Sequence, residues 1–131
     1  MSFNQILSHI ADGYAELVID GYEDWSTVID SITELTNAAE VAGLTRFLID
    51  FRRVDMRISV NEAPDIALFF KKYCLVDFDL AVILPQDAAA SATARAFAET
   101  LAGLGHDVAY LATPADRAAW IARTHCRAGA A

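Results

Sequence analysis

The most restrictive feature of this 131-residue sequence is a short apolar run, Phe47–Phe51, that leads directly into a charged segment. An amphipathic helical pattern precedes the run and another follows it. A short apolar segment between two helices is typical of a central parallel strand whose faces are both covered. The sequence therefore predicts an α/β fold with Phe47–Phe51 as a central strand.

The remaining segments predict a single domain over residues 1–131 with the element order ββαβαβαβα. The predicted strands are Gln5–Ala11, Tyr14–Asp20, Phe47–Phe51, Leu80–Leu84 and Val108–Leu111. The predicted helices cover about residues 25–43, 61–73 and 88–102, a last helix starts at Thr113–Pro114, and residues 124–131 form a frayed tail. Because parallel strands need helical crossovers, the expected fold is a four- to five-stranded mixed sheet with about four helices.

Three local signals predict the connections between these elements. Asp12-Gly13 predicts a hairpin with a two-residue type I′ turn, in which both central residues have positive φ. The residues from Arg52 to Ser59 are predicted to form a charged loop. Asn61 is the expected cap of the second helix, with Pro64 in its first turn.

The charge and the hydropathy exclude several classes of function. The net charge of −8 argues against nucleic-acid binding, which needs a basic face. No apolar run approaches the roughly 20 residues that span a bilayer, and the start of the chain has no signal-peptide pattern, so a cytoplasmic protein is expected. Residues 1–45 contain no lysine or arginine, which indicates either solvated acidic faces or a docking surface for a basic partner.

No catalytic or cofactor-binding signature is present in the sequence. It contains no dinucleotide-binding, phosphate-loop or nucleophile-elbow motif. His9, His106 and His125 are scattered, and Cys74 and Cys126 lack metal-ligand spacing. We therefore expect no metal, no cofactor, no disulfide and no enzymatic activity.

One charged cluster follows the central strand: Asp50, Arg52, Arg53, Asp55 and Arg57. Ligands of open α/β sheets bind at the carboxyl ends of the strands. Arginines at that edge could hold a carboxylate or a phosphate, which makes an anion-binding domain or an enzyme the alternative function. The competing interpretation is a loop whose charges satisfy one another.

The second predicted helix has an apolar sequence all around its axis. Leu68 and Phe69 cannot face the sheet at the same time as Ile66 and Phe70, because consecutive helical residues point in different directions. Another helix, an apolar small molecule or a second subunit must cover them, so the sequence leaves open a homodimer through this helix.

Four of these features resemble the SpoIIAA-like group of STAS/Sec14-type domains: the N-terminal hairpin, the aspartate-containing strand Phe47–Phe51, the apolar strand Leu80–Leu84, and the ending Arg117–Ile121. The resemblance covers nearly the whole chain. It implies a non-enzymatic regulatory module that acts through a protein partner or, from the Sec14 side, through a small apolar ligand or lipid.

The same resemblance points to a phosphorylation site. Anti-sigma-factor antagonists of this group carry a phosphorylated serine in an Asp-Ser-Ser/Thr-Gly-like motif at the start of the helix after the central strand. That place falls near Ser59, but the residues Met56–Asn61 lack the motif. Ser59 is therefore a candidate by position alone, since a helix N-terminus favours a phosphate.

Overall fold

The computed structural model describes residues 4–74 and 76–130, with side chains described as far as residue 123. The strands are β1 (Gln5–His9), β2 (Tyr14–Glu23), β3 (Arg46–Met56), β4 (Asp79–Ile83) and β5 (Asp107–Tyr110). The helices are α1 (Trp25–Ala42), α2 (Ala63–Tyr73), α3 (Ala88–Gly103) and α4 (Pro114–Ala130). This order confirms the predicted α/β class and the sequence ββαβαβαβα.

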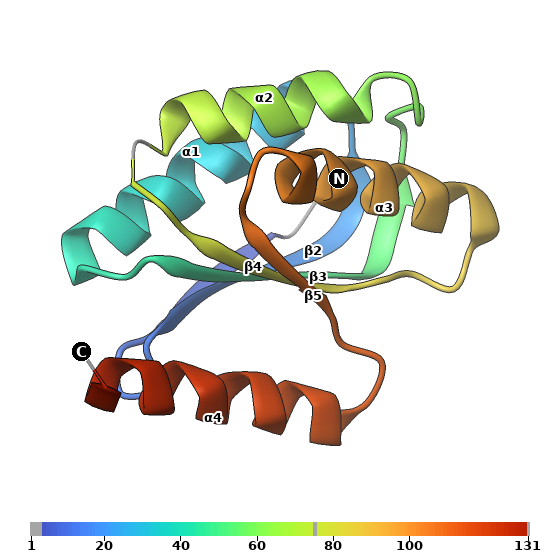
Figure 1. The fold of residues 1–131 in the computed structure, drawn as a ribbon. Coiled ribbons are helices and arrows are strands. Elements are labelled where there is room, and N and C mark those ends of the chain that lie inside the picture. The colour runs from blue at the N-terminus through green and yellow to red at the C-terminus, as the bar shows by residue number, and fades with distance from the viewer. Residues whose placement is uncertain (1–3, 75, 131) are drawn as a thin grey trace.

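The five strands form one mixed sheet in the order β1-β2-β3-β4-β5. β1 pairs with β2 in antiparallel fashion, and the other neighbouring pairs are parallel. Figure 1 shows α1, α2 and α3 on one face of this sheet and α4 on the opposite face. The carboxyl ends of β2 to β5 consequently meet at one edge of the sheet, where ligand sites of such folds occur.

The hairpin between β1 and β2 differs from the predicted one. β1 ends at His9, so four residues connect the strands, and the N–H of Gly13 donates to the His9 carbonyl at 2.8 Å. Gly13 has a φ of 79°, whereas no non-glycine residue in the described part of the chain has positive φ. The type I′ prediction is therefore wrong, because Asp12 does not adopt the left-handed conformation that this turn requires.

The central strand is much longer than predicted. β3 continues through the expected charged loop to Met56, because β2 pairs with it as far as Glu23 and Met56. β4 pairs with β3 only as far as Ile83, which lies opposite Asp50. β2 and β3 thus extend as a two-stranded ribbon beyond the rest of the sheet, and Arg52 and Arg53 lie in a strand.

Both ends of α1 are capped, whereas α2 begins differently from the prediction. Asp24 caps α1 by accepting from the Thr27 N–H at 2.9 Å, and Gly43 ends the helix with a φ of 71°. Asn61 is not the cap of α2: the N-cap is Glu62, which has no capping side-chain bond. The Glu62 carboxylate instead accepts from the Ser59 N–H at 2.9 Å.

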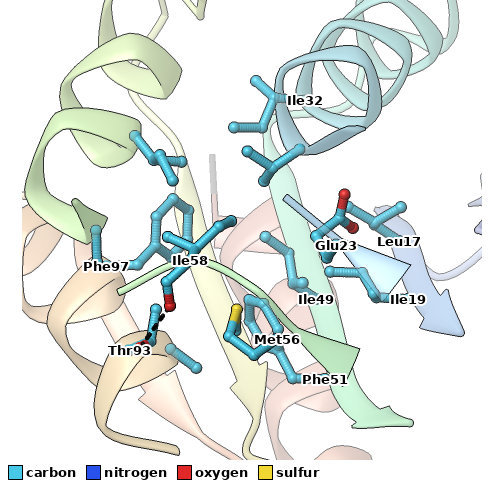
Figure 2. A pocket seen from close by; sticks show the side chains of 14 residues that line it. Leu17, Ile19, Glu23, Ile32, Ile49, Phe51, Met56, Ile58, Thr93 and Phe97 are labelled. Carbon is cyan, nitrogen blue, oxygen red and sulfur yellow. Dashed lines mark hydrogen bonds between the residues drawn. The ribbon is translucent and has the colours of Figure 1, made fainter. Parts of the chain in front are cut away.

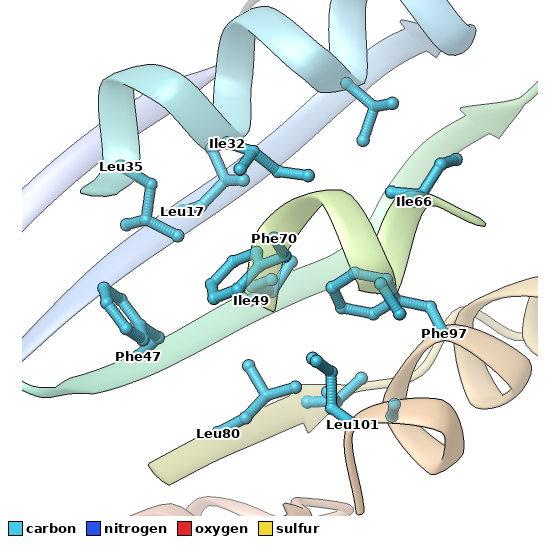
Figure 3. Packing of buried hydrophobic residues seen from close by; sticks show 14 of the residues in the cluster. Leu17, Ile32, Leu35, Phe47, Ile49, Ile66, Phe70, Leu80, Phe97 and Leu101 are labelled. Atoms are coloured by element: carbon cyan, nitrogen blue, oxygen red, sulfur yellow. The ribbon is translucent and has the colours of Figure 1, made fainter. Parts of the chain in front are cut away.

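Two apolar layers hold the helices to the sheet. On the α1–α3 face, Phe70 is fully buried and its ring lies 5.4 Å from Phe47 and 4.9 Å from Phe78, centroid to centroid (Figure 3). On the α4 face, Trp120 packs edge-on against Tyr14 at 5.5 Å. The second layer also contains Leu48, Ala81 and Leu111. The sheet is therefore buried on both faces, as the apolar central strands predicted.

Candidate functional site

The carboxyl edge of the sheet positions the carboxylate of Asp50 beside its own strand neighbour Arg52. Asp50 is 5% exposed, and the Arg52 side chain donates to both its oxygens, from Nε at 3.0 Å and from Nη2 at 2.8 Å. The Arg52 backbone N–H donates to Oδ1 at 3.0 Å. Burial alone would raise the pKa of Asp50, but these hydrogen bonds outweigh burial and hold the pKa below its ordinary value.

A second ion pair lies next to the first and joins β2 to the start of α4. Glu16 is 4% exposed and accepts from both terminal nitrogens of Arg117, at 2.7 and 3.2 Å. Arg117 also donates to the Tyr14 hydroxyl at 3.0 Å, and His9 Nε2 lies 2.9 Å from Glu16 Oε1. Burial alone would lower the pKa of Arg117, but the bonds to Glu16 and Tyr14 outweigh burial and hold the pKa above its ordinary value.

The strand register places the two buried carboxylates on the same sheet face. Glu16 is opposite Leu48 and Val18 is opposite Asp50, so Glu16 and Asp50 are diagonal neighbours. The register then shifts: Val18 pairs with Asp50, but Asp20 pairs with Arg53, so β3 contains one extra residue in this interval. This bulge turns Arg53 toward the same side as Arg52, where its Nη1 lies 3.6 Å from Asp20.

These side chains border two adjoining depressions. The first is a groove of about 510 Å³ over β1, β2 and β3, lined by both carboxylates and by Arg52 and Arg53. The second is a cleft of about 230 Å³ between Arg52 and Arg117, closed by Ile83 and by residues 111–114, which lead into α4. The charged side chains that line both depressions are paired with one another. This pairing favours the interpretation in which the charges of the cluster satisfy one another over a strongly basic anion site.

The structure does not bring all the predicted site residues together. Asp50, Arg52 and Arg53 share the groove, whereas Arg57 lies beyond the end of the β2–β3 ribbon. Arg57 pairs there with Asp55 at 3.1 Å and lies over the ring of Tyr22 at 5.6 Å. The five-residue cluster predicted from the sequence is thus split into two separate groups.

Ser59 is exposed in the connection between β3 and α2. A groove of about 450 Å³ lies between this connection and the first turns of α3, lined mainly by small and apolar side chains. The lining residues are Val54, Asp55, Met56, Ile58, Ser59, Val60, Asp87, Ala89, Ala90, Ala92 and Thr93. Phosphorylation of Ser59 stays a prediction.

Leu68 and Phe69 lie on α2, on the opposite face of the sheet from Arg52 and Arg117. Leu68 is 50% exposed, whereas Phe69 is half-buried and stacks on Tyr73 with ring centroids 5.5 Å apart. Ile66 and Phe70 face the core. This confirms that the four side chains cannot share one face, while a ligand or second subunit over Leu68 stays a prediction.

Sequence reasoning missed the contribution of Glu16 and Arg117. Glu16 stands at an outward position of β2, and such a position is usually solvated near a sheet edge. Its burial depends on α4 crossing to the far face of the sheet, which no local pattern encodes. The only available signal was an acid flanked by Ala15 and Leu17 within a buried strand.

Comparison with known proteins adds the identity of this fold. The structure is similar to the solved structure of the anti-sigma factor antagonist SpoIIAA in its unphosphorylated form, with a TM-score of 0.58. The alignment covers 88% of this chain and 92% of that chain at 15% sequence identity. The chain has a SpoIIAA-like STAS fold. At this identity the SpoIIAA likeness establishes the architecture alone. Neither a scan against known protein families nor a search of the curated proteins gives a match.

Two further observations concern metal sites and membrane-spanning helices. Among the side chains of residues 4–74 and 76–123, no three His, Cys, Asp or Glu groups lie together so that they could hold a metal ion. None of the helices in the same part of the chain has the length and apolar character needed to cross a membrane. Cys74 is buried with a free thiol, while the Cys126 side chain lies outside the described residues.

Proposed function

We propose that this domain is a non-enzymatic regulatory module that acts by contact with a protein partner. The likeness to the fold of an anti-sigma factor antagonist carries this proposal. The buried charges at the carboxyl edge support it, because Asp50 is bonded to Arg52 and Glu16 to Arg117. Because each of these two carboxylates is held by an arginine, neither is free to act as a general acid or base.

The groove between the β3–α2 connection and α3 is the surface we assign to the partner. Val60 is 46% exposed at its rim, and Ala89 and Ala92 are exposed on the facing helix. Small side chains let another protein approach closely, and Asp87 adds a negative charge at the rim, whereas the charge of Asp55 is balanced by Arg57. A partner with an apolar contact residue and a basic rim fits this surface.

Site-specific photo-crosslinking in cells of the native host tests the assignment. A photoreactive residue at position 60 should give one defined higher-mass adduct, and Ala92→Arg should abolish that adduct by filling the groove. Val41 is 91% exposed on α1 and provides the matched control position. Identical adduct patterns from positions 60 and 41 would contradict the proposal.

A second candidate function is anion binding, which the cleft between Arg52 and Arg117 favours. Among the described residues, Arg52 bonds Asp50 through Nε and Nη2, and Arg117 bonds Glu16 and Tyr14 through Nη1 and Nη2. Nη1 of Arg52 and Nε of Arg117 take no part in these bonds and could donate to a ligand. Guanidinium groups bind carboxylate or phosphate through such N–H groups.

Titration calorimetry with inorganic phosphate and with citrate tests this candidate. Arg52→Ala should abolish binding, while Arg57→Ala should leave it unchanged. Arg57 is a matched control because it pairs with Asp55 two residues earlier, as Arg52 pairs with Asp50. No measurable heat with either anion would remove this candidate and leave protein contact as the proposed function.

A further inference from the structure

A carboxyl group lies buried among apolar side chains at the end of β2. Glu23 is 1% exposed, and its Oε2 accepts from Asn4 Nδ2 at 2.9 Å. Its other oxygen, Oε1, is buried and has no hydrogen-bond partner among the described residues. A buried oxygen without a partner is costly to a fold, so a native structure that retains one needs an explanation.

Glu23 lines a small cavity between the sheet and the helices that is partly open to the surface. The cavity has a volume of about 30 Å³, and its other walls are almost entirely aliphatic or aromatic (Figure 2). Leu17, Ile19 and Ile49 come from the strands, and Phe97 comes from α3 (Figure 2). Glu23 is thus the one ionisable group among the lining residues.

This cavity offers a water molecule few hydrogen-bond partners. Buried waters typically make about three hydrogen bonds, and the only other polar lining residue is Thr93. The Thr93 hydroxyl already lies 3.2 Å from the Ile58 carbonyl and 3.3 Å from the Ala89 carbonyl. A water would therefore have Glu23 as its main partner, whereas a molecule with one polar group and an apolar body needs no more than that.

The wall formed by Met56 can adapt to a larger occupant. Met56 ends β3, is half-buried, and points its sulfur into the cavity (Figure 2). An unbranched thioether side chain has three rotatable bonds and repacks readily. A cavity of about 30 Å³ takes the polar group, and the space that Met56 vacates takes the apolar body.

We propose that this cavity binds a small, largely apolar molecule with a single hydroxyl group, and that the hydroxyl bonds to Oε1 of Glu23. A hydroxyl both donates and accepts, so it suits this carboxyl in its ionised and its neutral form. The inference does not depend on the proposed protein contact.

Methyl NMR of the full chain with two ring compounds of similar shape tests the proposal. Phenol carries the hydroxyl and toluene carries a methyl group in its place. Phenol should give saturable shifts of the Ile32, Ile49 and Met56 methyl groups, with an affinity about tenfold above that of toluene, as one hydrogen bond allows. Glu23→Leu should reduce this preference to about twofold or less.

A second variant keeps the test decisive if Glu23→Leu does not fold. Met56→Ala enlarges the cavity and should tighten phenol binding several-fold. Failure of phenol to give saturable shifts in both wild type and Met56→Ala would overturn the proposal. Equal affinities for phenol and toluene in the wild type, or an undiminished phenol preference in folded Glu23→Leu, would overturn it as well.

Discussion

Arg117 of α4 and Glu16 of β2, 101 positions apart in the sequence, form a bidentate ion pair. The distance from Nη2 to Oε1 is 2.7 Å and the distance from Nη1 to Oε2 is 3.2 Å. Glu16 is almost completely buried, so removal of its partner leaves a carboxylate in a site of low polarity. This pair, together with the packing of Trp120, fastens α4 to the sheet.

Arg117→Ala should lower the free energy of unfolding by about 2–3 kcal/mol, less than for a fully enclosed pair because Arg117 is partly exposed. Urea unfolding measures the change. Arg123→Ala is the matched control. Arg123 lies on the same helix as Arg117 and pairs with Asp107 of β5, but the side chains of Arg123 and Asp107 are both about half exposed. The control should cost less than about 1 kcal/mol, and equal costs would contradict the structural role of Arg117.

Phe69 and Phe70 are adjacent residues with opposite environments, which predicts very different costs of truncation. Phe70→Ala should cost about 3–5 kcal/mol because its ring is fully buried against Phe47, Phe78 and Phe97. Phe69→Ala should cost about 1 kcal/mol, since the ring is half-buried and stacks on Tyr73 alone among the described rings. Chemical denaturation of both variants checks the order, and a larger cost at Phe69 would contradict the packing.

Glu23 predicts a stability that falls as the pH rises. Burial raises the pKa of Glu23, although the nearby Thr27 hydroxyl and the Asn4 amide oppose the shift. The folded chain therefore holds a proton that the unfolded chain releases, and stability is lost from the unfolded pKa of about 4.3 up to the folded pKa. Glu23→Gln should gain stability relative to wild type between pH 5 and pH 8. Parallel pH profiles of the two proteins in urea unfolding would contradict this.

Asp50 predicts the opposite trend. Its pKa is lowered in the folded protein, so its contribution is present above the unfolded pKa of about 3.9 and is lost as the pH falls through the folded pKa. Asp50→Asn should be less stable than wild type at pH 7, and the difference should shrink as the pH falls into the acid range. Urea unfolding at pH 3 and pH 7 measures both values, and a deficit independent of pH would point to packing alone.

The exposed apolar surface on and just after α2 predicts self-association. Leu68, Tyr73 and Val76 are each about half exposed, and we expect this apolar surface to support a homodimer at tens of micromolar. Sedimentation velocity should show the dimer for wild type and a folded monomer for Leu68→Lys, whereas Val41→Lys on α1 should leave the dimer intact. A monomeric wild type would eliminate this interface.

Those elements of the fold that depend on local sequence signals could be predicted from the sequence. The apolar run Phe47–Phe51 lies in β3, and Thr113–Pro114 stands at the start of α4, as predicted. The length of β3 was missed because its charged half gains strand structure only by pairing with β2, a long-range event.

The composition of the carboxyl-edge site could be predicted only in part. Asp50 and Arg52 are two residues apart on one strand, so they necessarily share a face. Glu16 joins them through strand register, and Arg117 joins them because α4 packs on the second face of the sheet. Neither relationship can be read from the spacing of residues in the sequence. Arg57 was wrongly grouped with these residues because the β2–β3 ribbon places it away from the groove, where it pairs with Asp55.

The position of α4 has a consequence for the order in which the domain matures. Its 17 residues are translated after all five strands and the other three helices, yet they alone among the described helices cover the second face of the sheet. Until the ribosome has added Trp120, the apolar side chains of Tyr14, Leu48 and Ala81 have no helix over them. A nascent or truncated chain that lacks α4 would expose that apolar surface to chaperones and proteases, whereas a chain with α4 in place covers it.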